Sequence, residues 1–427
     1  MSLLAKMQQN ELKNIQIQSR EQYETFVSAG FSLNLTRGIP SPDMLDISMK
    51  VLGSLDDRKS TTSEDGYDTR NYGHLEGLPE ARRLMASILD VPYENVIMGG
   101  NSSIALIHAT FSMAYIKGLA NSTLPWKDEK DIKILCPSPG FDRHFEIAEF
   151  FGFTPVPVQI TETGPNMDIV EGLVNNDPSI KGIICVPKYS NPTGCTYSND
   201  TIRRLASLDP VAKDFCIFYD NAYAVHDFDQ DNPQVLLPLF SELKKNNKEN
   251  MAIMFSSTSK ISFPGGGITA IATGKEQLKI INDYFSLQTI CFDKINQIRH
   301  VRYFKDINGI KVHMKKVQSI VFPKFNAVLN TLESELGGLG IAQWSSPNGG
   351  YFISLDTNEG LATRVTQLCA GAGLQLLPAG SAFPFKKDPK DQNIRISPTS
   401  LPIEDLVNAT KILALCIKLA TIEKLLV

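Results

Sequence analysis

The middle of the chain alternates short apolar runs with segments whose apolar residues recur at helical spacing. Ser103–Ile116 and Asp142–Phe151 are examples of the helical segments. Continuous apolar strands separated by helices predict a largely parallel sheet with helices on both faces. This α/β pattern covers about Gly66 to His300 and indicates a three-layer αβα domain. The expected strands are Asn95–Met98, Ile132–Cys136, Gly182–Val186, Phe215–Tyr219, Ala252–Phe255 and Ile268–Ala272.

The pattern changes after about Asn308. A long helix over Lys311–Leu336 is followed by strand-like stretches and by a terminal helix over Ile403–Leu426. The strand-like stretches are Tyr351–Leu355 and Ile394–Ile396, so this part is expected to be a smaller α+β domain. The chain begins with a polar amphipathic helix. We therefore expect an N-terminal segment (1–65) that packs with the small domain, a large domain (66–307) and a small C-terminal domain (308–427).

Composition narrows the class of protein. A length of 427 residues favours two domains, and 42% hydrophobic with 21% charged residues is ordinary for a globular protein. The net charge of −4 disfavours a general nucleic-acid partner. No apolar stretch reaches the roughly 18 residues of a membrane span, and the N-terminus lacks a secretory signal. Seven scattered cysteines indicate free thiols and a cytoplasmic location, and the spacing of the six histidines predicts no metal site.

Polar clusters follow five of the expected strands. In open α/β sheets, ligands bind beyond the carboxyl ends of the strands, so five such clusters at one edge predict a binding site. The clusters are Gly99–Ser103, Pro137–His144, Pro187–Gly194, Asp220–Tyr223 and Ser256–Lys260.

Two residues in these clusters suggest a specific chemistry. Lys260 follows a buried strand, and a partly desolvated amine has a lowered pKa and can form an imine. A solvated loop lysine is the alternative. Asp220 ends an apolar strand, where a carboxylate needs a partner such as a protonated pyridine nitrogen. The alternative for Asp220 is a turn or helix-capping role.

Other residues complete this chemistry, although each has an ordinary structural alternative. Tyr223 and Asn191 can donate hydrogen bonds to a phenolate oxygen. The Asn101-Ser102-Ser103 segment opens a helix and suits a phosphate group, or simply caps that helix. Phe141 could stack on a flat ring or pack in a loop. Arg395 could bind a carboxylate or form a structural ion pair. Together these groups match a pyridoxal phosphate (PLP) enzyme that acts on an amino acid.

The order of motifs resembles one enzyme family. The chain is similar to fold-type-I PLP aminotransferases of the class I/II superfamily, in particular to the divergent aspartate aminotransferase subgroup related to the MocR effector domain. The likeness spans nearly the whole chain. The motifs are LTRGIPSP, YGHLEGLPEAR, GGNSSIAL, PSPGFDRH, PKYSNPTG, FYDNAYAVH, SSTSKISFPGGG, DKINQIRH, PNGGYF and NIRISP.

The resemblance implies a role for each matching residue. Lys260 would be the Schiff-base lysine and the proton shuttle, and Asp220 would pair with the pyridine nitrogen with His144 behind it. Tyr72 would reach the phosphate of a neighbouring subunit, which implies a homodimer with shared sites. The remaining implied contacts are Tyr223 and Asn191 with O3′, Phe141 with the ring, Asn101, Ser102, Ser103 and Ser257 with the phosphate, and Arg395 and the Gly38 backbone with the substrate α-carboxylate.

The sequence departs from the family at one position. The family has a phosphate-binding arginine eight residues beyond the lysine, where this chain has Ile268. Lys294 or Arg299 is our hypothesis for the replacement cation. The implied reaction is a ping-pong transamination between aspartate and 2-oxoglutarate, with Arg37 as a candidate for the side-chain carboxylate. A non-catalytic effector-binding protein and a PLP lyase or decarboxylase are the alternatives.

Overall fold

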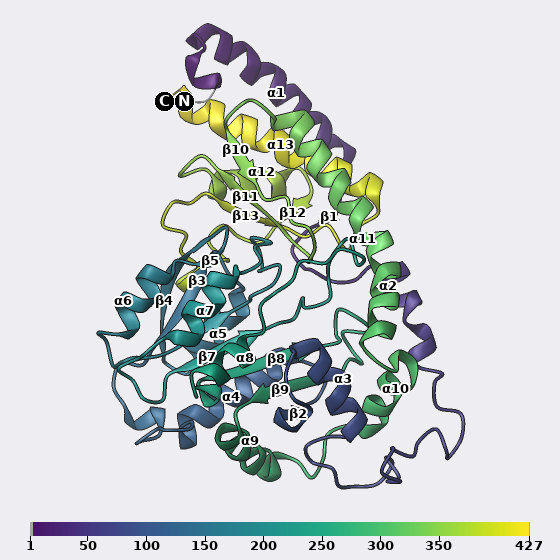
Figure 1. Ribbon diagram of the computed structural model, residues 1–427. Helices are drawn as coiled ribbons and strands as arrows, with labels where there is room; N and C mark the ends of the chain where they lie inside the picture. The colour runs from purple at the N-terminus through teal and green to yellow at the C-terminus, as the bar shows by residue number, and fades with distance from the viewer. Residues whose placement is uncertain (1–2, 427) are drawn as a thin grey trace.

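The computed structural model describes residues 3–426 and is built around one eight-stranded sheet (Figure 1). The strand order is β2-β9-β8-β7-β6-β3-β4-β5. Strands β8, β7, β6, β3 and β4 are parallel to their neighbours in this run, whereas β9 is antiparallel to both β8 and β2. The strands are β2 (Val96–Met98), β3 (Lys133–Ser138), β4 (Thr154–Thr161), β5 (Gly164–Pro165), β6 (Ile180–Cys185), β7 (Cys216–Asp220), β8 (Ala252–Ser257) and β9 (Thr269–Thr273).

The strands are apolar on both faces because helices cover both. In β7, Ile217 and Tyr219 belong to one buried cluster, whereas Cys216 and Phe218 belong to a second cluster on the other face. Helices α4, α5 and α9 pack in the second cluster, and α3, α6, α7 and α8 pack in the first. The helices are α3 (Pro79–Leu89), α4 (Ser103–Lys117), α5 (Asp142–Phe150), α6 (Met167–Val174), α7 (Asn199–Ser207), α8 (Leu239–Lys245) and α9 (Lys275–Gln288).

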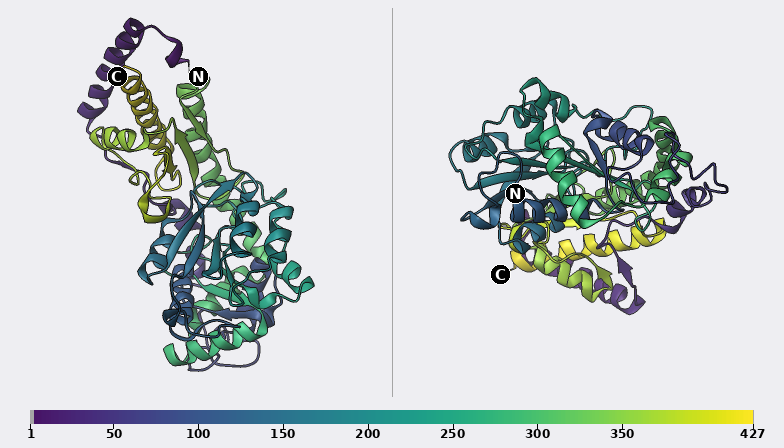
Figure 2. Two further views of the ribbon diagram at one scale, coloured as in Figure 1. Left: turned by 90° about the vertical axis from the view of Figure 1, so that its left-hand side faces the viewer. Right: turned by 90° about the horizontal axis from the view of Figure 1, so that it is seen from below.

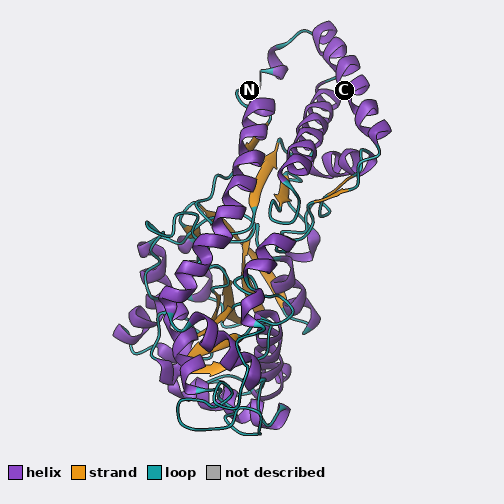
Figure 3. Cartoon of the chain, turned by 90° about the vertical axis from the view of Figure 1, so that its right-hand side faces the viewer, coloured by secondary structure: helices purple, strands orange, loops and turns teal. Residues whose placement is uncertain are grey.

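The C-terminal part of the chain packs above the carboxyl end of this sheet (Figure 2). Its strands β10, β11 and β13 form an antiparallel sheet, and β12 pairs in parallel with β1 near the N-terminus. Helix α11 runs along one side of the molecule from the C-terminal part to α10 (Figure 1), and Figure 3 shows the molecule from that side. The elements are α1 (Gln9–Ala29), β1 (Leu33–Asn34), α2 (Pro42–Ile47), α10 (Lys294–Phe304), α11 (Ile307–Leu336), β10 (Ala342–Trp344), β11 (Ile353–Thr357), α12 (Ala362–Gly371), β12 (Leu374–Gln375), β13 (Asn393–Ile396) and α13 (Ile403–Leu425).

The α/β class and the mostly parallel sheet predicted from the sequence are confirmed. Each expected strand and helix is present, with ends that differ by a few residues. Strand β4 was not predicted, because Pro155 and Pro157 interrupt its apolar pattern and cannot donate ladder hydrogen bonds. Among the described residues, no helix is both long and apolar enough to span a membrane.

Candidate active site

Lys260 lies three residues beyond the end of β8 and lines a cavity of about 210 Å³. Burial lowers the pKa of its ammonium group, and the positive charge of Arg395 lowers it further, although Asp220 opposes both effects. A lysine with a lowered pKa is a better nucleophile near neutral pH. The cavity brings together residues from all five predicted clusters, namely Asn101, Ser102, Ser103, Ile104, Phe141, Val186, Asn191, Asp220, Ala222, Tyr223, Ser259, Lys260 and Pro264.

Asp220 is the last residue of β7 and forms part of the cavity wall. Its Oδ2 lies 3.1 Å from Nε2 of His144, and the two side chains are only 5% and 2% exposed. Its Oδ1 is buried and has no hydrogen-bond partner among the described residues. A buried carboxylate oxygen without a partner is costly, so this atom marks a position where a ligand donor would be stabilised.

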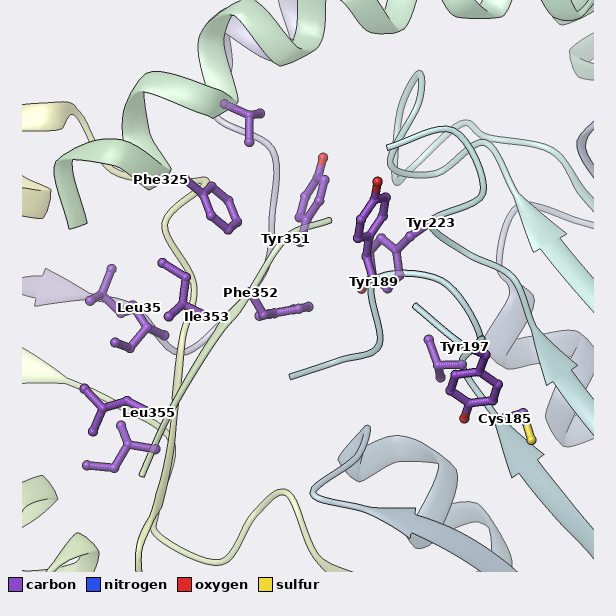
Figure 4. Close-up of a cluster of buried hydrophobic side chains, with 14 of the residues drawn as sticks. Leu35, Cys185, Tyr189, Tyr197, Tyr223, Phe325, Tyr351, Phe352, Ile353 and Leu355 are labelled. Atoms are coloured by element: carbon purple, nitrogen blue, oxygen red, sulfur yellow. The ribbon is translucent and has the colours of Figure 1, made fainter. Parts of the chain in front are cut away.

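Tyr223 and Asn191 lie on two other sides of the same cavity. Lys260 Nζ is 5.1 Å from the centre of the Tyr223 ring, and burial raises the pKa of the Tyr223 hydroxyl, which therefore stays protonated and can donate. Figure 4 shows Tyr223 in a buried cluster with Tyr189, Tyr351 and Phe352. Asn191 is buried, and its Oδ1 accepts a hydrogen bond from Arg395 Nη1 at 3.3 Å.

The first turn of α4 forms the polar end of the cavity. Ser102 caps this helix, since its Oγ accepts a 3.4 Å hydrogen bond from the Ala105 N–H. The free N–H groups of a helix N-terminus attract anions. Asn101 is exposed, and its side-chain amide donates to the Pro264 and Gly265 carbonyls at 3.5 and 3.4 Å. This contact joins the start of α4 to the loop that follows Lys260.

Arg395 of β13 does not line the cavity itself but contacts Asn191, which does, and its side chain is only 8% exposed. Its Nη2 donates to the Thr36 carbonyl at 3.0 Å, and its guanidinium carbon lies 4.8 Å from the centre of the Phe352 ring. Burial lowers its pKa, although the nearby Asp142 carboxylate opposes that effect. Gly38 lies against Phe352, so closely that an added Cβ would be 2.5 Å from Cζ of that ring. Arg395 thus contacts the Phe352 ring and the Thr36 carbonyl, and its Nε has no hydrogen-bond partner among the described residues.

Several predicted residues lie outside this cavity. Ser257 is buried, and its Oγ accepts a hydrogen bond from the Ser259 N–H at 3.0 Å, which shapes the approach to Lys260. Tyr72 is 69% exposed, and Arg37 is also exposed, next to the Thr36 carbonyl that Arg395 contacts. Ile268 is buried, and its N–H donates to Thr258 Oγ1 at 2.9 Å.

The two cations proposed for the phosphate lie in α10. Lys294 is its first residue and is buried, whereas Arg299 is half-buried and its Nε has no partner in the described part of the chain. Nδ2 of Asn296 donates to the Gly266 and Gly267 carbonyls, at 2.8 Å in each case. Helix α10 therefore begins against the glycine-rich loop that follows Lys260.

Four residues near the site were not singled out from the sequence. His226 and Tyr351 both contact the Lys260 carbonyl, Phe352 stacks against Arg395, and Asp142 Oδ1 lies 3.7 Å from Arg395 Nη1. His226 closes the FYDNAYAVH motif, and both aromatic residues close the PNGGYF motif. Their place in motifs was therefore the available signal, but their contacts depend on the fold.

The chain matches known proteins over nearly its full length. The family model for aspartate amino-transferase matches residues 7–427. An aspartate aminotransferase of Corynebacterium glutamicum is 40% identical over 404 residues, which are 95% of this chain and 93% of that protein.

Solved structures give the same result. The crystal structure of an aspartate transaminase from C. glutamicum superposes with a TM-score of 0.96 at 38% identity and covers 100% of this chain and 99% of its own. An alpha-aminoadipate aminotransferase from Thermus thermophilus, at 18% identity, shares the fold with a TM-score of 0.74 over 92% of this chain and 93% of its own. The chain belongs to the aspartate aminotransferase family of fold-type-I PLP enzymes and is a transaminase.

Proposed function

We propose that this aminotransferase binds PLP in the Lys260 cavity and transfers the amino group between aspartate and 2-oxoglutarate by a ping-pong mechanism. The observation that carries the proposal is the buried and unpartnered Oδ1 of Asp220 in the wall of the cavity that contains the Lys260 amine. A family that uses PLP supports the choice of cofactor. The name of the C. glutamicum relative supports aspartate as the substrate.

The residues of the cavity fit this cofactor. Asp220, supported by His144, would accept a hydrogen bond from the protonated pyridine nitrogen and keep that proton in place, and the Tyr223 hydroxyl and Asn191 amide would face the phenolic oxygen. The start of α4 would hold the phosphate through backbone N–H groups and hydroxyls, with Ser102 and Ser103 in the cavity wall. Phe141 would cover one face of the ring, and Ser257 would order the turn before Lys260.

When bound, PLP would act as the electron sink that makes the substrate Cα acidic. The chain supplies positions and proton transfer. Lys260 in its neutral form would act as a general base and take the proton from the substrate Cα. It would then act as a general acid and deliver that proton to C4′ of the cofactor. Its lowered pKa increases the fraction of the neutral form at a given pH. The buried Tyr223 stays protonated, so it remains a hydrogen-bond donor throughout.

Arg395 would bind the substrate α-carboxylate. Its Nε has no hydrogen-bond partner among the described residues, and its guanidinium group lies between Phe352 and Asn191, which lines the cavity. A carboxylate can accept two parallel hydrogen bonds from such a flat cation. The Gly38 backbone next to Phe352 would border this position. Arg37, which is exposed in the same segment, remains our candidate for the side-chain carboxylate of aspartate.

We propose a homodimer in which Tyr72 of each subunit reaches the phosphate of the other. The 69% exposure of Tyr72 and its location away from the cavity of its own chain support this arrangement.

We also propose the division of the chain into residues 1–65, 66–307 and 308–427. The pairing of β1 with β12, which joins the N-terminal segment to the C-terminal part, supports this division. Residues 1, 2 and 427 lie outside the described residues.

We propose that a residue of α10 balances the negative charge of the phosphate. Lys294 or Arg299 would neutralise it, from the same chain or from the partner, because α10 begins against the loop after Lys260. Replacing both residues with Ala should weaken PLP binding, and equilibrium dialysis measures this directly. An unchanged PLP affinity in the double variant would rule out both residues.

The transamination proposal is tested by mixing the PLP-loaded protein with single amino acids and following the visible absorbance of the cofactor. Aspartate and glutamate should bleach the visible band fastest, and 2-oxoglutarate should restore it. Lys260→Ala should bind PLP without turnover. An absorbance that no amino acid changes would contradict the proposal and support an effector-binding role, whereas release of carbon dioxide or cleavage products would support a different PLP reaction.

A further inference from the structure

Three of the six histidines converge on one short segment of the chain. His226, His313 and His300 contact residues 260, 261 and 262 respectively, and they come from the loop after β7, from α11 and from α10. All three are buried, at 0%, 3% and 0% exposure. Three separate elements therefore hold consecutive residues at the lysine that would carry the cofactor.

The Lys260 carbonyl has two donors. His226 Nε2 lies 3.3 Å from this oxygen, and the Tyr351 hydroxyl donates to it, also at 3.3 Å. Tyr351 belongs to the C-terminal part of the chain, and the segment before it is joined to the His226 loop, where Gly350 N–H donates to the His226 carbonyl at 2.9 Å. The two rings pack edge to face with centres 5.6 Å apart.

The next two residues also contact one histidine each, Ile261 through its carbonyl and Ser262 through its hydroxyl. His313 Nε2 lies 2.8 Å from the Ile261 carbonyl, so Nε2 carries the proton that is donated. His300 Nδ1 lies 2.8 Å from the Asn296 carbonyl in its own helix, which leaves Nε2 as the acceptor for the Ser262 hydroxyl at 2.8 Å. Each ring thus has a defined tautomer and a defined partner on the lysine segment.

Burial keeps these imidazoles neutral. It lowers the pKa of His226 to about 3, with a further contribution from the Lys260 cation, and lowers the pKa of His300 to about 4. It also lowers the pKa of His313. A neutral ring adds no positive charge beside an amine that must itself be deprotonated to react, whereas a lysine or arginine at the same positions would add one.

We infer that His226, His300 and His313 are positioning residues that hold residues 260–262, His226 and His313 through main-chain carbonyls and His300 through the Ser262 hydroxyl. They would thereby set the direction from which the Lys260 amine reaches the cofactor and the substrate. This inference rests on the proposed function for its catalytic consequence. The contacts with the main chain do not depend on the cofactor. Tyr351 serves the same carbonyl from the C-terminal part of the chain.

The contact atoms allow a matched pair of substitutions. Glutamine can place a side-chain N–H near the position of histidine Nε2, whereas asparagine places it near Nδ1. For His226 and His313, where Nε2 makes the contact, the Gln variants should therefore behave as wild type and the Asn variants should not. Tyr351→Phe removes one hydroxyl and keeps the ring. His108→Asn is the control, because His108 is exposed on α4.

The first readout needs no cofactor. Amide hydrogen exchange of the peptide that covers residues 257–262 in the apoprotein should be faster in His226→Asn and His313→Asn than in the Gln variants and in His108→Asn. The second readout uses the PLP-loaded dimer. Here the Asn variants should lose about ten- to a hundredfold in kcat with KM nearly constant, because a misplaced reacting group weakens catalysis more than binding. In the variants that lose kcat, the pH midpoint of the visible absorbance of the cofactor should also shift.

Two results would overturn the inference. One is equal exchange in the Asn and Gln variants, and the other is a wild-type kcat and absorbance midpoint in His226→Asn, His313→Asn and Tyr351→Phe. If the Asn variants do not fold, Tyr351→Phe alone decides, since an unchanged midpoint contradicts the inference and a shifted one supports it. Failure of the wild-type protein to bind PLP would refute the proposed function and leave the exchange result standing.

Discussion

Substitution of Asp142 tests whether Arg395 binds the carboxylate of the substrate. Asp142 is the first residue of α5, and its Oδ1 lies 3.7 Å from Arg395 Nη1. That oxygen is buried and accepts no hydrogen bond from the described residues. A substrate carboxylate and Asp142 would therefore compete for the same guanidinium group. We predict that Asp142→Asn lowers KM, because it removes the competitor and keeps the size of the side chain.

The distance sets the magnitude. Two unit charges 3.7 Å apart attract by roughly 4.5 kcal/mol at an effective dielectric constant of about 20. The separation exceeds a hydrogen bond, and desolvation of a buried pair offsets much of the attraction. A net competition of about 1 kcal/mol remains, which corresponds to roughly a fivefold lower KM. Loss of the negative charge at the start of α5 should cost about 0.3–1 kcal/mol of stability.

Steady-state kinetics measures this effect on both half-reactions. KM for the amino acid and for the 2-oxo acid should fall together, because both carry the carboxylate that Arg395 would bind, and kcat should change little. Glu146→Gln is the matched control, since Glu146 lies on the same helix and pairs with Arg143 at 2.8 Å instead. A KM that stays constant or rises for both substrates would show that Asp142 does not compete with the substrate and would refute the reasoning.

Three further predictions follow from the same contacts. Asp220→Asn should leave PLP bound but lower kcat by about 10²–10³-fold, because a neutral amide would no longer stabilise a protonated pyridine nitrogen; a kcat near wild type would contradict the role of Asp220. Gly38→Ala should raise KM about tenfold or more through displacement of Phe352, which an added Cβ would approach to 2.5 Å, and wild-type KM values would show that Phe352 moves freely. The folded pKa of His300, about 4, lies below its ordinary value of 6.5, so the folded state binds fewer protons between these values, and stability that is full above pH 6.5 should be lost as the pH falls toward 4. His300→Gln should reduce this loss in thermal unfolding measured across that range, and an unchanged pH dependence would assign the acid sensitivity to other groups.

The sequence was sufficient to predict those features that depend on local pattern. Strand β7 is an apolar run that ends in Asp220, so both its burial and its terminal carboxylate could be inferred before the fold was known. The same holds for α4, where a strand is followed by Asn101 and a serine that caps the helix. Because parallel strands place their carboxyl ends at one edge, the convergence of these clusters in one cavity followed from the strand pattern as well.

Features that depend on contacts between distant segments could not be predicted in this way. His313 is one of many polar residues on a long helix, and only the fold brings its Nε2 to the Ile261 carbonyl. The two-residue pairing of β1 with β12 is too short to leave a periodic pattern. From the sequence, Asp142 could be identified only as a residue in the first turn of a helix. Its ion pair is with Arg395, which lies in a strand more than two hundred residues away along the chain.

The loop after Lys260 supports our proposal that the cation for the phosphate comes from another part of the structure. Gly267 packs so tightly on Ser259 that an added Cβ would lie 2.9 Å from its backbone nitrogen, and Ile268 is buried with its N–H bonded to Thr258. An arginine at either position would disrupt the turn that presents the lysine. The carbonyls of this loop are instead held by Asn101, which precedes α4, and by Asn296 of α10, so the loop is fixed by two neutral amides. The close packing of this glycine-rich turn therefore supports the proposal that Lys294 or Arg299 of α10 would balance the charge of the phosphate.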